Sequence, residues 1–171
     1  MRLFAFPLLL AVLATPAAAQ EVPAAQARFI AVNQAVSALL ADAGNPTAAS
    51  LVSALSRRSS ALCEMAQDGR ISNWLGVVAQ SDIEAGVLII SVGPEATIKV
   101  VELPAEGALR DSLATLAEGE EVLVSGRFVV EGADSDRVHC FRQEGGLTVA
   151  ALRQPQFEFR VSSVVPLEVQ D

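Results

Sequence analysis

The hydrophobic positions of the first part of the chain recur at the spacing of an α-helix. From Ala24 to Ala43 the large apolar side chains lie three or four residues apart, at Phe29, Val32, Val36, Leu39 and Leu40. This spacing predicts an amphipathic helix with one buried stripe. A second run continues at helical spacing through Leu51, Leu55, Leu62 and Met65. Together the two runs predict an antiparallel helical hairpin.

Short polar and glycine-containing segments separate these runs from each other and from the second half of the chain. Gly44-Asn45-Pro46 interrupts the first helix. We expect Asn45 to be the N-cap of the second helix and Pro46 to be its first residue. Asp68-Gly69 comes after the second run, and the glycine can end that helix in the left-handed conformation.

Beyond Gly69 the hydrophobic period changes to two, which predicts strands. The first three are expected at residues 71–80, 87–92 and 96–103, with a hairpin turn at 81–86. The segment 104–118 returns to helical spacing and predicts a short helix. Alternation resumes from Val122 to Val130, and Gly126 marks a position where a bulge or bend is expected. Short strand candidates at 137–143 and 147–152 precede a last strand at 156–165.

The chain begins with the pattern of a secretory signal. Arg2 precedes an apolar run from Leu3 to Ala14, and Ala17-Ala18-Ala19 comes next as a cleavage site of the A-x-A kind. The apolar run is shorter than the roughly 20 residues that a membrane span needs. We therefore expect cleavage after Ala19 and a periplasmic or secreted protein, without a transmembrane segment after cleavage.

The charge of the mature chain bears on its partners. Without the signal, eleven Lys and Arg side chains stand against twenty Asp and Glu, which gives a net charge of −9 with His139 neutral. Nucleic-acid binding normally needs a basic surface. The basic residues are scattered along the sequence, and only Arg57-Arg58 are adjacent. Nucleic acid is therefore not an expected partner.

Two cysteines, Cys63 and Cys140, are present. Disulfides persist in an exported protein, so a bond between these two is the simplest expectation, and two buried free thiols are the alternative. The bond would close a loop of 76 intervening residues. It would tie the helical half of the chain to its last strands.

Three stretches of the sequence, together with the predicted order of elements, resemble a known family of domains. They are Asn73-Trp74-Leu75-Gly76-Val77-Val78, Leu116 to Phe128, and Pro155 to Val161. In the order strand, strand, strand, helix, strand, strand, they resemble exported bacterial OB-fold-like domains of the tRNA-anticodon-like type, over about residues 71–165. The resemblance implies a five-stranded or slightly larger Greek-key β-barrel, which we expect at 70–171. With the helical hairpin at 20–69 and the signal peptide at 1–19, we expect an α+β protein in which the hairpin packs on the barrel. The resemblance implies no chemistry, because such domains mostly have no assigned activity.

Seven residues define the expected barrel motif: Trp74, Gly76, Gly119, Gly126, Phe128, Phe157 and Phe159. Trp74 and Gly76 should share one face of the first strand, and Gly119 should let the chain leave the helix in a conformation that other residues resist. OB domains that hold single-stranded nucleic acid combine a positive groove with stacking aromatic rings. The mature chain has one Trp, five Phe and no Tyr, so we expect its rings in the core and not on a ligand face.

Candidate catalytic and metal-binding residues are few. His139 is the only histidine, and on a strand its neighbour Cys140 would point to the opposite face, which argues against a nucleophilic pair. The loop from Glu131 to Asp136 lacks the frame of an EF-hand, and Asp82 with Glu84 is a weaker oxygen set, so solvated turns explain both better. No catalytic residue, metal or cofactor is expected.

The leading hypothesis is a non-enzymatic exported module that binds a protein, peptide or small ligand of the cell envelope. The alternative is that the N-terminal helices mediate self-association or inhibit an envelope enzyme, because Phe29, Val36 and Leu40 form an apolar stripe. A hydrolase that uses His139 comes third.

Overall fold

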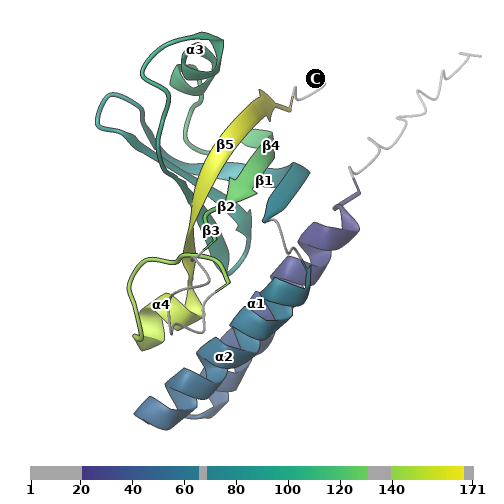
Figure 1. Cartoon of the computed structure of the whole chain (residues 1–171), viewed down its shortest axis with the longest axis vertical. Coiled ribbons are helices and arrows are strands. Elements are labelled where there is room, and N and C mark those ends of the chain that lie inside the picture. The colour runs from purple at the N-terminus through teal and green to yellow at the C-terminus, as the bar shows by residue number, and fades with distance from the viewer. Residues whose placement is uncertain (1–20, 66–68, 131–139, 168–171) are drawn as a thin grey trace, which may run out of the picture.

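The computed structural model describes residues 21–65, 69–130 and 140–167. Two N-terminal helices precede a closed barrel of five strands, and the α+β class predicted from the sequence is confirmed (Figure 1). In chain order the elements are α1 (Ala24–Asp42), α2 (Ala48–Met65), β1 (Arg70–Asp82), β2 (Val87–Gly93), β3 (Ala96–Val100), α3 (Ala108–Ala114), β4 (Glu121–Phe128), α4 (Val149–Arg153) and β5 (Gln156–Pro166).

Helices α1 and α2 lie side by side as the predicted hairpin (Figure 1). Phe29, Val36 and Leu40 of the predicted stripe are buried, whereas Leu39 is 42 % exposed. The buried face of α1 also includes the polar side chains of Gln26 and Asn33. The helix thus buries a mixed face, in which the amide N–H groups of Gln26 and Asn33 donate to backbone carbonyls.

Gln26 joins the hairpin to the barrel. Its Nε2 donates to the carbonyl oxygens of Leu75 at 2.5 Å and Val92 at 3.1 Å, and its Oε1 accepts from the Leu75 N–H at 2.8 Å. Three backbone groups of β1 and β2 are therefore satisfied by one side chain of α1.

The start of α2 differs from the sequence prediction. Asn45 and Pro46 are not its first residues, since the helix begins at Ala48. Thr47 acts as the cap: its Oγ1 accepts from the Ser50 N–H at 3.2 Å, and its carbonyl accepts from the Leu51 N–H at 3.0 Å. A threonine hydroxyl satisfies free N–H groups of the first turn, which places Asn45 and Pro46 in the connection before the helix.

The barrel closes in the strand order β1-β2-β3-β5-β4, with β4 paired back to β1. All neighbouring strands are antiparallel except β3 and β5, which are parallel. Helix α3 lies between β3 and β4 in the chain, as in an OB-like barrel. The order of elements is therefore compatible with an OB-like fold.

Two glycines let neighbouring strands approach closely. Gly76 and Trp74 both face the interior from β1, and a Cβ at Gly76 would lie 2.5 Å from Cγ2 of Ile90 on β2. At Gly126 the register of β4 with β5 shifts, as expected of a bulge, and a Cβ there would lie 2.3 Å from the Arg160 carbonyl oxygen. Both positions exclude larger side chains because backbone or branched carbon already fills the space.

Gly119 precedes β4 with a φ of 86° in the left-handed region, and nothing lies near its missing Cβ. Its N–H donates to the Val78 carbonyl at 2.8 Å. The glycine is therefore needed for backbone conformation, which a side chain would resist, and not for space.

The barrel core is aromatic and is shared with the hairpin. Trp74, Phe128, Phe157 and Phe159 are all buried, with Phe29 of α1 among them. The Phe128 ring contacts the rings of Trp74, Phe157 and Phe159 with centroids 5.3 to 5.9 Å apart. Leu113 of α3 and Leu62 of α2 belong to the same core, so helices contribute to it from both sides of the barrel in Figure 1.

The predicted strand at 147–152 is wrong, because Val149–Arg153 forms helix α4. Thr148 caps it by accepting from the Ala151 N–H at 3.1 Å, and Leu152 is buried against Val36, Leu40 and Leu55 of the hairpin. The cap and this second apolar cluster stabilise a helix that the alternation did not indicate.

The strand candidate at 137–143 is realised only as single bridges within the described residues. Phe141 pairs with Val130, and Gln143 pairs with Phe157. Residues 137–139 lie outside the described part of the chain.

Polar contacts fix α4 on the hairpin. Arg58 of α2 is 1 % exposed and donates to the carbonyl of Leu152 and, at 3.4 Å, to Oε1 of Gln143. No carboxylate of the described residues pairs with it, and burial lowers the pKa of Arg58 to about 10. In return, Arg153 Nη2 donates to the Leu40 carbonyl at 2.9 Å, and Ser37 Oγ donates to the Arg153 carbonyl at 2.6 Å.

Candidate functional site

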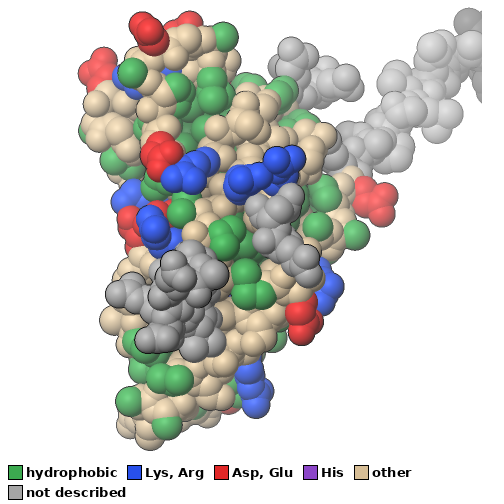
Figure 2. Space-filling view, in the orientation of Figure 1, with side chains coloured by type: hydrophobic (Ala, Val, Ile, Leu, Met, Phe, Trp, Pro, Cys, Tyr) green, Lys and Arg blue, Asp and Glu red, His purple; other side chains and the backbone are tan. Residues whose placement is uncertain are grey.

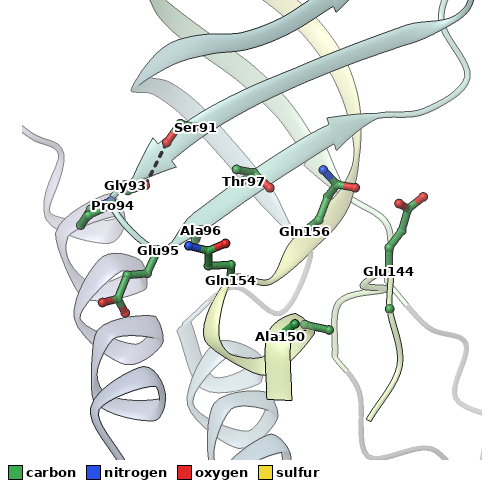
Figure 3. Close-up of a pocket in the computed structure, with 12 residues that line it drawn as sticks. Ser91, Gly93, Pro94, Glu95, Ala96, Thr97, Glu144, Ala150, Gln154 and Gln156 are labelled. Atoms are coloured by element: carbon green, nitrogen blue, oxygen red, sulfur yellow. Dashed lines mark hydrogen bonds between the residues drawn. The ribbon is translucent and has the colours of Figure 1, made fainter. Parts of the chain in front are cut away.

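A cleft of about 610 Å³ lies where the β2–β3 turn faces α4 (Figure 3). We call it the seam cleft, because it lies at the junction between the barrel and α4, the helix that packs on the hairpin. Its polar side chains come from both sides of that junction: Ser91, Glu95, Thr97, Glu144, Gln154 and Gln156. Ligand sites in proteins are commonly concave and carry a few convergent polar groups, so this cleft is the candidate site.

The parallel pairing of β3 with β5 forms one wall of the seam cleft. Thr97 is the register partner of Gln156, and its N–H donates to the Pro155 carbonyl at 3.0 Å. Both side chains are half-buried and stand on adjacent strands (Figure 3). The backbone ladder thus holds a hydroxyl and a carboxamide next to each other.

An ion pair fixes the opposite end of the cleft. Lys99 Nζ lies 2.5 Å from Oε1 of Glu144, and the Glu144 N–H donates to the Gln156 carbonyl at 2.9 Å. Glu144 is therefore neutralised by its neighbour. Of the two carboxylates that line the cleft, Glu95 is the one whose charge no described residue of the lining compensates.

Glu95 stands at the turn between β2 and β3 and points toward α1 (Figure 3). Its Oε2 is buried without a hydrogen-bond partner among the described residues. Glu95 and Gln154 also line a smaller hollow of about 290 Å³, beside Ser37 and Arg153, whose buried Nε likewise has no partner among these residues. The seam therefore contains an acceptor and a donor whose hydrogen-bonding capacity is unused, which is costly for buried groups.

The residues singled out in the sequence do not line this cleft. Trp74, Gly76, Gly126, Phe128, Phe157 and Phe159 belong to the barrel interior or to its strand contacts, and Gly119 lies in a turn. Their aromatic rings are 2 % exposed or less. They build the scaffold and offer no stacking surface.

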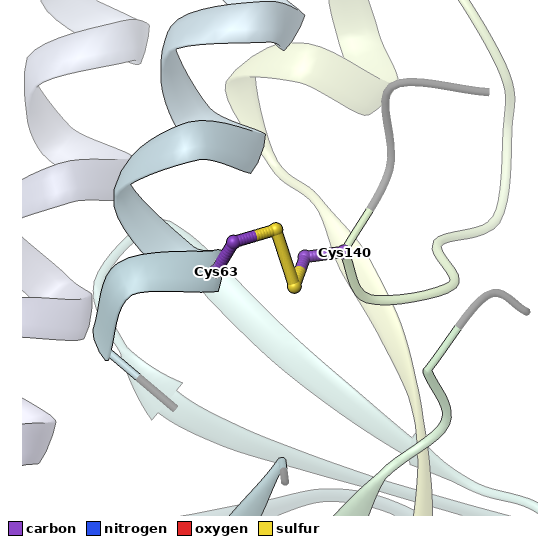
Figure 4. The surroundings of a disulfide bond; sticks show 2 residues. All are labelled: Cys63 and Cys140. Carbon is purple, nitrogen blue, oxygen red and sulfur yellow. A yellow bond between two sulfur atoms is a disulfide. The ribbon is translucent and has the colours of Figure 1, made fainter. Parts of the chain in front are cut away.

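Cys63 of α2 and Cys140 lie at disulfide distance, with their Cα atoms 5.3 Å apart and their sulfur atoms joined in Figure 4. The bridge links the end of α2 to the segment that leads to α4. It therefore restrains the same junction along which the seam cleft runs.

The remaining candidates of the sequence carry no site within the described residues. His139 and the loop Glu131 to Asp136 lie outside them, as does the predicted signal at 1–19. Asp82 Oδ1 accepts from the Ala85 N–H at 2.9 Å, which is ordinary turn chemistry for an aspartate. Among the described residues no group of three or more His, Cys, Asp or Glu side chains could hold a metal ion.

No helix in the described ranges is both long and apolar enough to cross a membrane.

No protein-family model matches the chain, and no curated protein matches it significantly.

Sequence reasoning missed the polar residues of the seam. Glu95 comes directly after Gly93-Pro94, and Gln154 and Gln156 flank Pro155, so each reads as an ordinary turn residue. Only the parallel pairing of β3 with β5 brings the two turns together. The one signal in the sequence was the presence of uncharged amides beside a proline at the start of a strand, which is too common to predict a site.

Proposed function

We propose that this chain is an exported, non-enzymatic binding module that holds a peptide segment in the seam cleft. The observation that carries the proposal is a pair of polar atoms without partners among the described residues: Oε2 of Glu95, which lines both the seam cleft and the smaller hollow, and Nε of Arg153, which lines the smaller hollow. A peptide backbone supplies both a donor and an acceptor in each residue. It could therefore supply partners to both side chains when they turn toward the bound segment, while the hydroxyl and amides of Thr97, Gln154 and Gln156 hold further backbone groups.

The charge of the cleft favours a neutral or basic peptide. Glu144 is paired with Lys99, so Glu95 supplies the net negative charge of the lining residues. A peptide with a lysine or arginine near the bound segment would complement it. A strongly acidic peptide would be repelled both here and by the mature chain as a whole, whose net charge is −9.

Export is part of the same proposal. The signal pattern at residues 1–19 and the pairing of Cys63 with Cys140 support it, since disulfides persist outside the cytoplasm. The closed five-stranded barrel is compatible with an OB-like fold, and the finer likeness to exported domains of the tRNA-anticodon-like type rests on the three sequence stretches that resemble them. Sequencing of the protein from the envelope fraction should find Gln20 as the first residue, and a mature chain that retains Arg2 would contradict export by this signal.

A peptide selection tests the binding function. Random peptides displayed on phage are selected on the mature chain (residues 20–171), and the enriched peptides are measured by fluorescence polarisation. We expect Glu95→Gln to weaken the enriched peptides about tenfold, as loss of a charged hydrogen bond does. Glu84→Gln, an exposed carboxylate at the β1–β2 turn, is the matched control and should leave affinity unchanged.

A second variant tests the place of binding. Ala150 is exposed on α4 and lines the cleft, so Ala150→Trp should fill the cleft without removing a buried contact. Failure to enrich any peptide, or equal affinity for the Ala150→Trp variant, would contradict the proposal. The same preparation should show no turnover in a broad hydrolase screen.

Self-association through the helices is the second candidate. Phe29, Val36 and Leu40, which motivated it, are buried within the chain, and the helical side chains that favour it are Leu39 and Val52, which are 42 % and 50 % exposed. Light scattering of the mature chain decides between a monomer, which we expect, and an oligomer that Leu39→Ser with Val52→Ser would dissociate.

A further inference from the structure

Three arginines that are far apart in the sequence are aligned across three neighbouring strands. Arg70 of β1 is the register partner of Arg127 of β4, and Arg127 is the register partner of Arg160 of β5. All three are exposed on the outer face of the barrel, next to inward-facing Ile71, Phe128 and Phe159. We call these three residues the arginine row. With one strand spacing of about 4.8 Å between neighbours, the row spans about 10 Å.

This alignment opposes the usual rules for a sheet surface. Like charges directly opposite each other on adjacent strands destabilise the pairing. The mature chain is also strongly acidic, with a net charge of −9. Figure 2 nevertheless shows Lys and Arg side chains gathered in a band across this face, over β1, β4 and β5. Glu102 compensates the charge of Arg160 within the row, and strand pairing alone does not account for the alignment of the three arginines.

The arginine row borders a groove of about 680 Å³. Besides the row, its lining includes Ser72, Ser125 and Ser162. Ser72 and Ser162 are exposed, so their hydroxyls are accessible from solvent. Guanidinium groups and hydroxyls together form a set of donors suited to the oxygens of an anion.

Two residues of unusual backbone conformation form hydrogen bonds with side chains that line this groove. Glu102 and Asn73 are the non-glycine residues with positive φ in the described part of the chain, at 56° and 54°. Glu102 receives two hydrogen bonds from Arg160, one from Nε at 2.7 Å and one from Nη2. The Asn73 N–H donates to Ser125 Oγ at 2.9 Å. Left-handed conformations of non-glycine residues are uncommon and often mark functional positions.

We propose that the arginine row is a binding site for a compact phosphate-type oxyanion, carried by a small soluble molecule. Planar guanidinium groups match phosphate oxygens in bidentate geometry, and two such groups one strand spacing of about 4.8 Å apart can each bind one phosphoryl group of a diphosphate. The site shares no lining residue with the seam cleft and does not depend on the peptide function.

The surrounding charges favour a compact anion over an extended one. Glu102 and Glu158 lie beside the row, and Glu158 pairs with Arg142 at 3.2 Å. The mature chain as a whole carries a net charge of −9, which disfavours a long polyanion or an anionic membrane. At physiological salt, charges act over about 8 Å, which is comparable to the length of the row.

Titration with sodium pyrophosphate tests the site, with amide chemical shifts of the ¹⁵N-labelled mature chain as the readout. Saturable shifts should concentrate in β1, β4 and β5. Arg127→Gln should weaken binding about tenfold. Arg57→Gln is the matched control, because Arg57 is an exposed arginine on α2, and it should leave affinity unchanged. Glu102→Gln should strengthen binding, since it removes the carboxylate that competes for Arg160.

Three results would overturn the proposal. They are the absence of saturable shifts in the wild type, an equal loss in the Arg57→Gln and Arg127→Gln variants, and tight flotation with phosphatidylglycerol vesicles that pyrophosphate does not compete away. Because Arg127 is exposed, its variant should fold, and a circular dichroism spectrum checks this. Arg160→Gln provides a second variant from the same row.

Discussion

The ring of Phe29 in α1 lies 5.1 Å from the ring of Trp74 in β1, centroid to centroid, inside the barrel core. Phe29 also stacks on Phe128 at 5.4 Å and meets Phe157 edge-on at 5.3 Å. One helical residue thus contacts aromatic rings from three strands. The hairpin and the barrel share a core across the boundary expected between residues 69 and 70.

Phe29→Ala should therefore destabilise the whole protein. Loss of a fully buried phenyl ring lowers the free energy of unfolding by about 3–5 kcal/mol. Urea denaturation, followed by the fluorescence of Trp74, the single tryptophan, measures this change in the free energy of unfolding. Leu39→Ala, on the exposed side of the same helix, should change the free energy by less than about 0.5 kcal/mol. Equal effects of the two variants would show that the ring does not pack as described.

Oxidation state should control stability. A bond between Cys63 and Cys140 spans a sequence separation of 77 residues, and restriction of the unfolded chain by such a loop contributes about 4 kcal/mol. Reduction, or the double change Cys63→Ser and Cys140→Ser, should lower the unfolding free energy by about this amount. Dithiothreitol should have no further effect on the double variant. Two alkylated thiols in the unreduced protein, detected by mass spectrometry, would exclude the bond.

Gly76→Ala should be unfavourable for a steric reason. The added methyl group would lie 2.5 Å from Cγ2 of Ile90, and overpacking of this kind costs about 1–3 kcal/mol. The same change in an Ile90→Ala background should cost less, because the obstructing atom is gone. Thermal unfolding of the four proteins gives the coupling energy, and strictly additive effects would contradict the close approach.

Adjacent Arg57 and Arg58 should respond differently to the same substitution. Arg58 is buried and donates to two acceptors, and lysine cannot reproduce that forked geometry. Arg58→Lys should lower the unfolding free energy by about 1–3 kcal/mol. Arg57→Lys, on the exposed face, should have an effect below about 0.5 kcal/mol. Chemical denaturation distinguishes the two, and equal effects would contradict the buried role of Arg58.

The pKa of Glu102 should lie below its ordinary value. Its hydrogen bonds with Arg160, and then the Arg160 charge, lower the pKa of this carboxyl below its ordinary value. Because folding lowers the pKa of Glu102, its ion pair with Arg160 stabilises the folded protein at pH values above the ordinary carboxyl pKa. This stabilisation is lost as the pH falls through the pKa of Glu102 in the folded protein. Carbon-detected NMR of the side chain measures the midpoint. Arg160→Gln should return it toward the ordinary value, and an unchanged midpoint would exclude the ion pair in solution.

The hydrophobic period predicted most of the scaffold because burial matches it. Trp74 and Gly76 face inward on β1, and Phe157 and Phe159 do so on β5, as alternation requires. Helix α4 was missed because five residues are too few to display a helical period, and Leu147 and Val149 mimic alternation. Its formation depends on the Thr148 cap and on packing of Leu152, which are local and tertiary effects.

The polar surfaces could not be predicted, because they depend on register. Arg70, Arg127 and Arg160 align only after bulges shift the pairing near Ile71 on β1 and at Gly126 on β4. A slip of one residue would send each side chain to the other face of its strand. Polar Gln26 likewise interrupts an apolar stripe and gives no sign that it bonds to Leu75 and Val92.

Gln26 also covers an unpaired edge of strand β1. The pairing of β1 with β2 runs from Val77 to Asp82, so at Leu75 the helix glutamine stands in for the missing partner strand. Unpaired strand margins recruit foreign chains. Detachment of the hairpin would therefore expose the backbone N–H and C=O groups of Leu75, through which β1 could pair with another chain. We expect the Gln26 side chain, which belongs to a helix outside the barrel, to protect the protein from aggregation in this way.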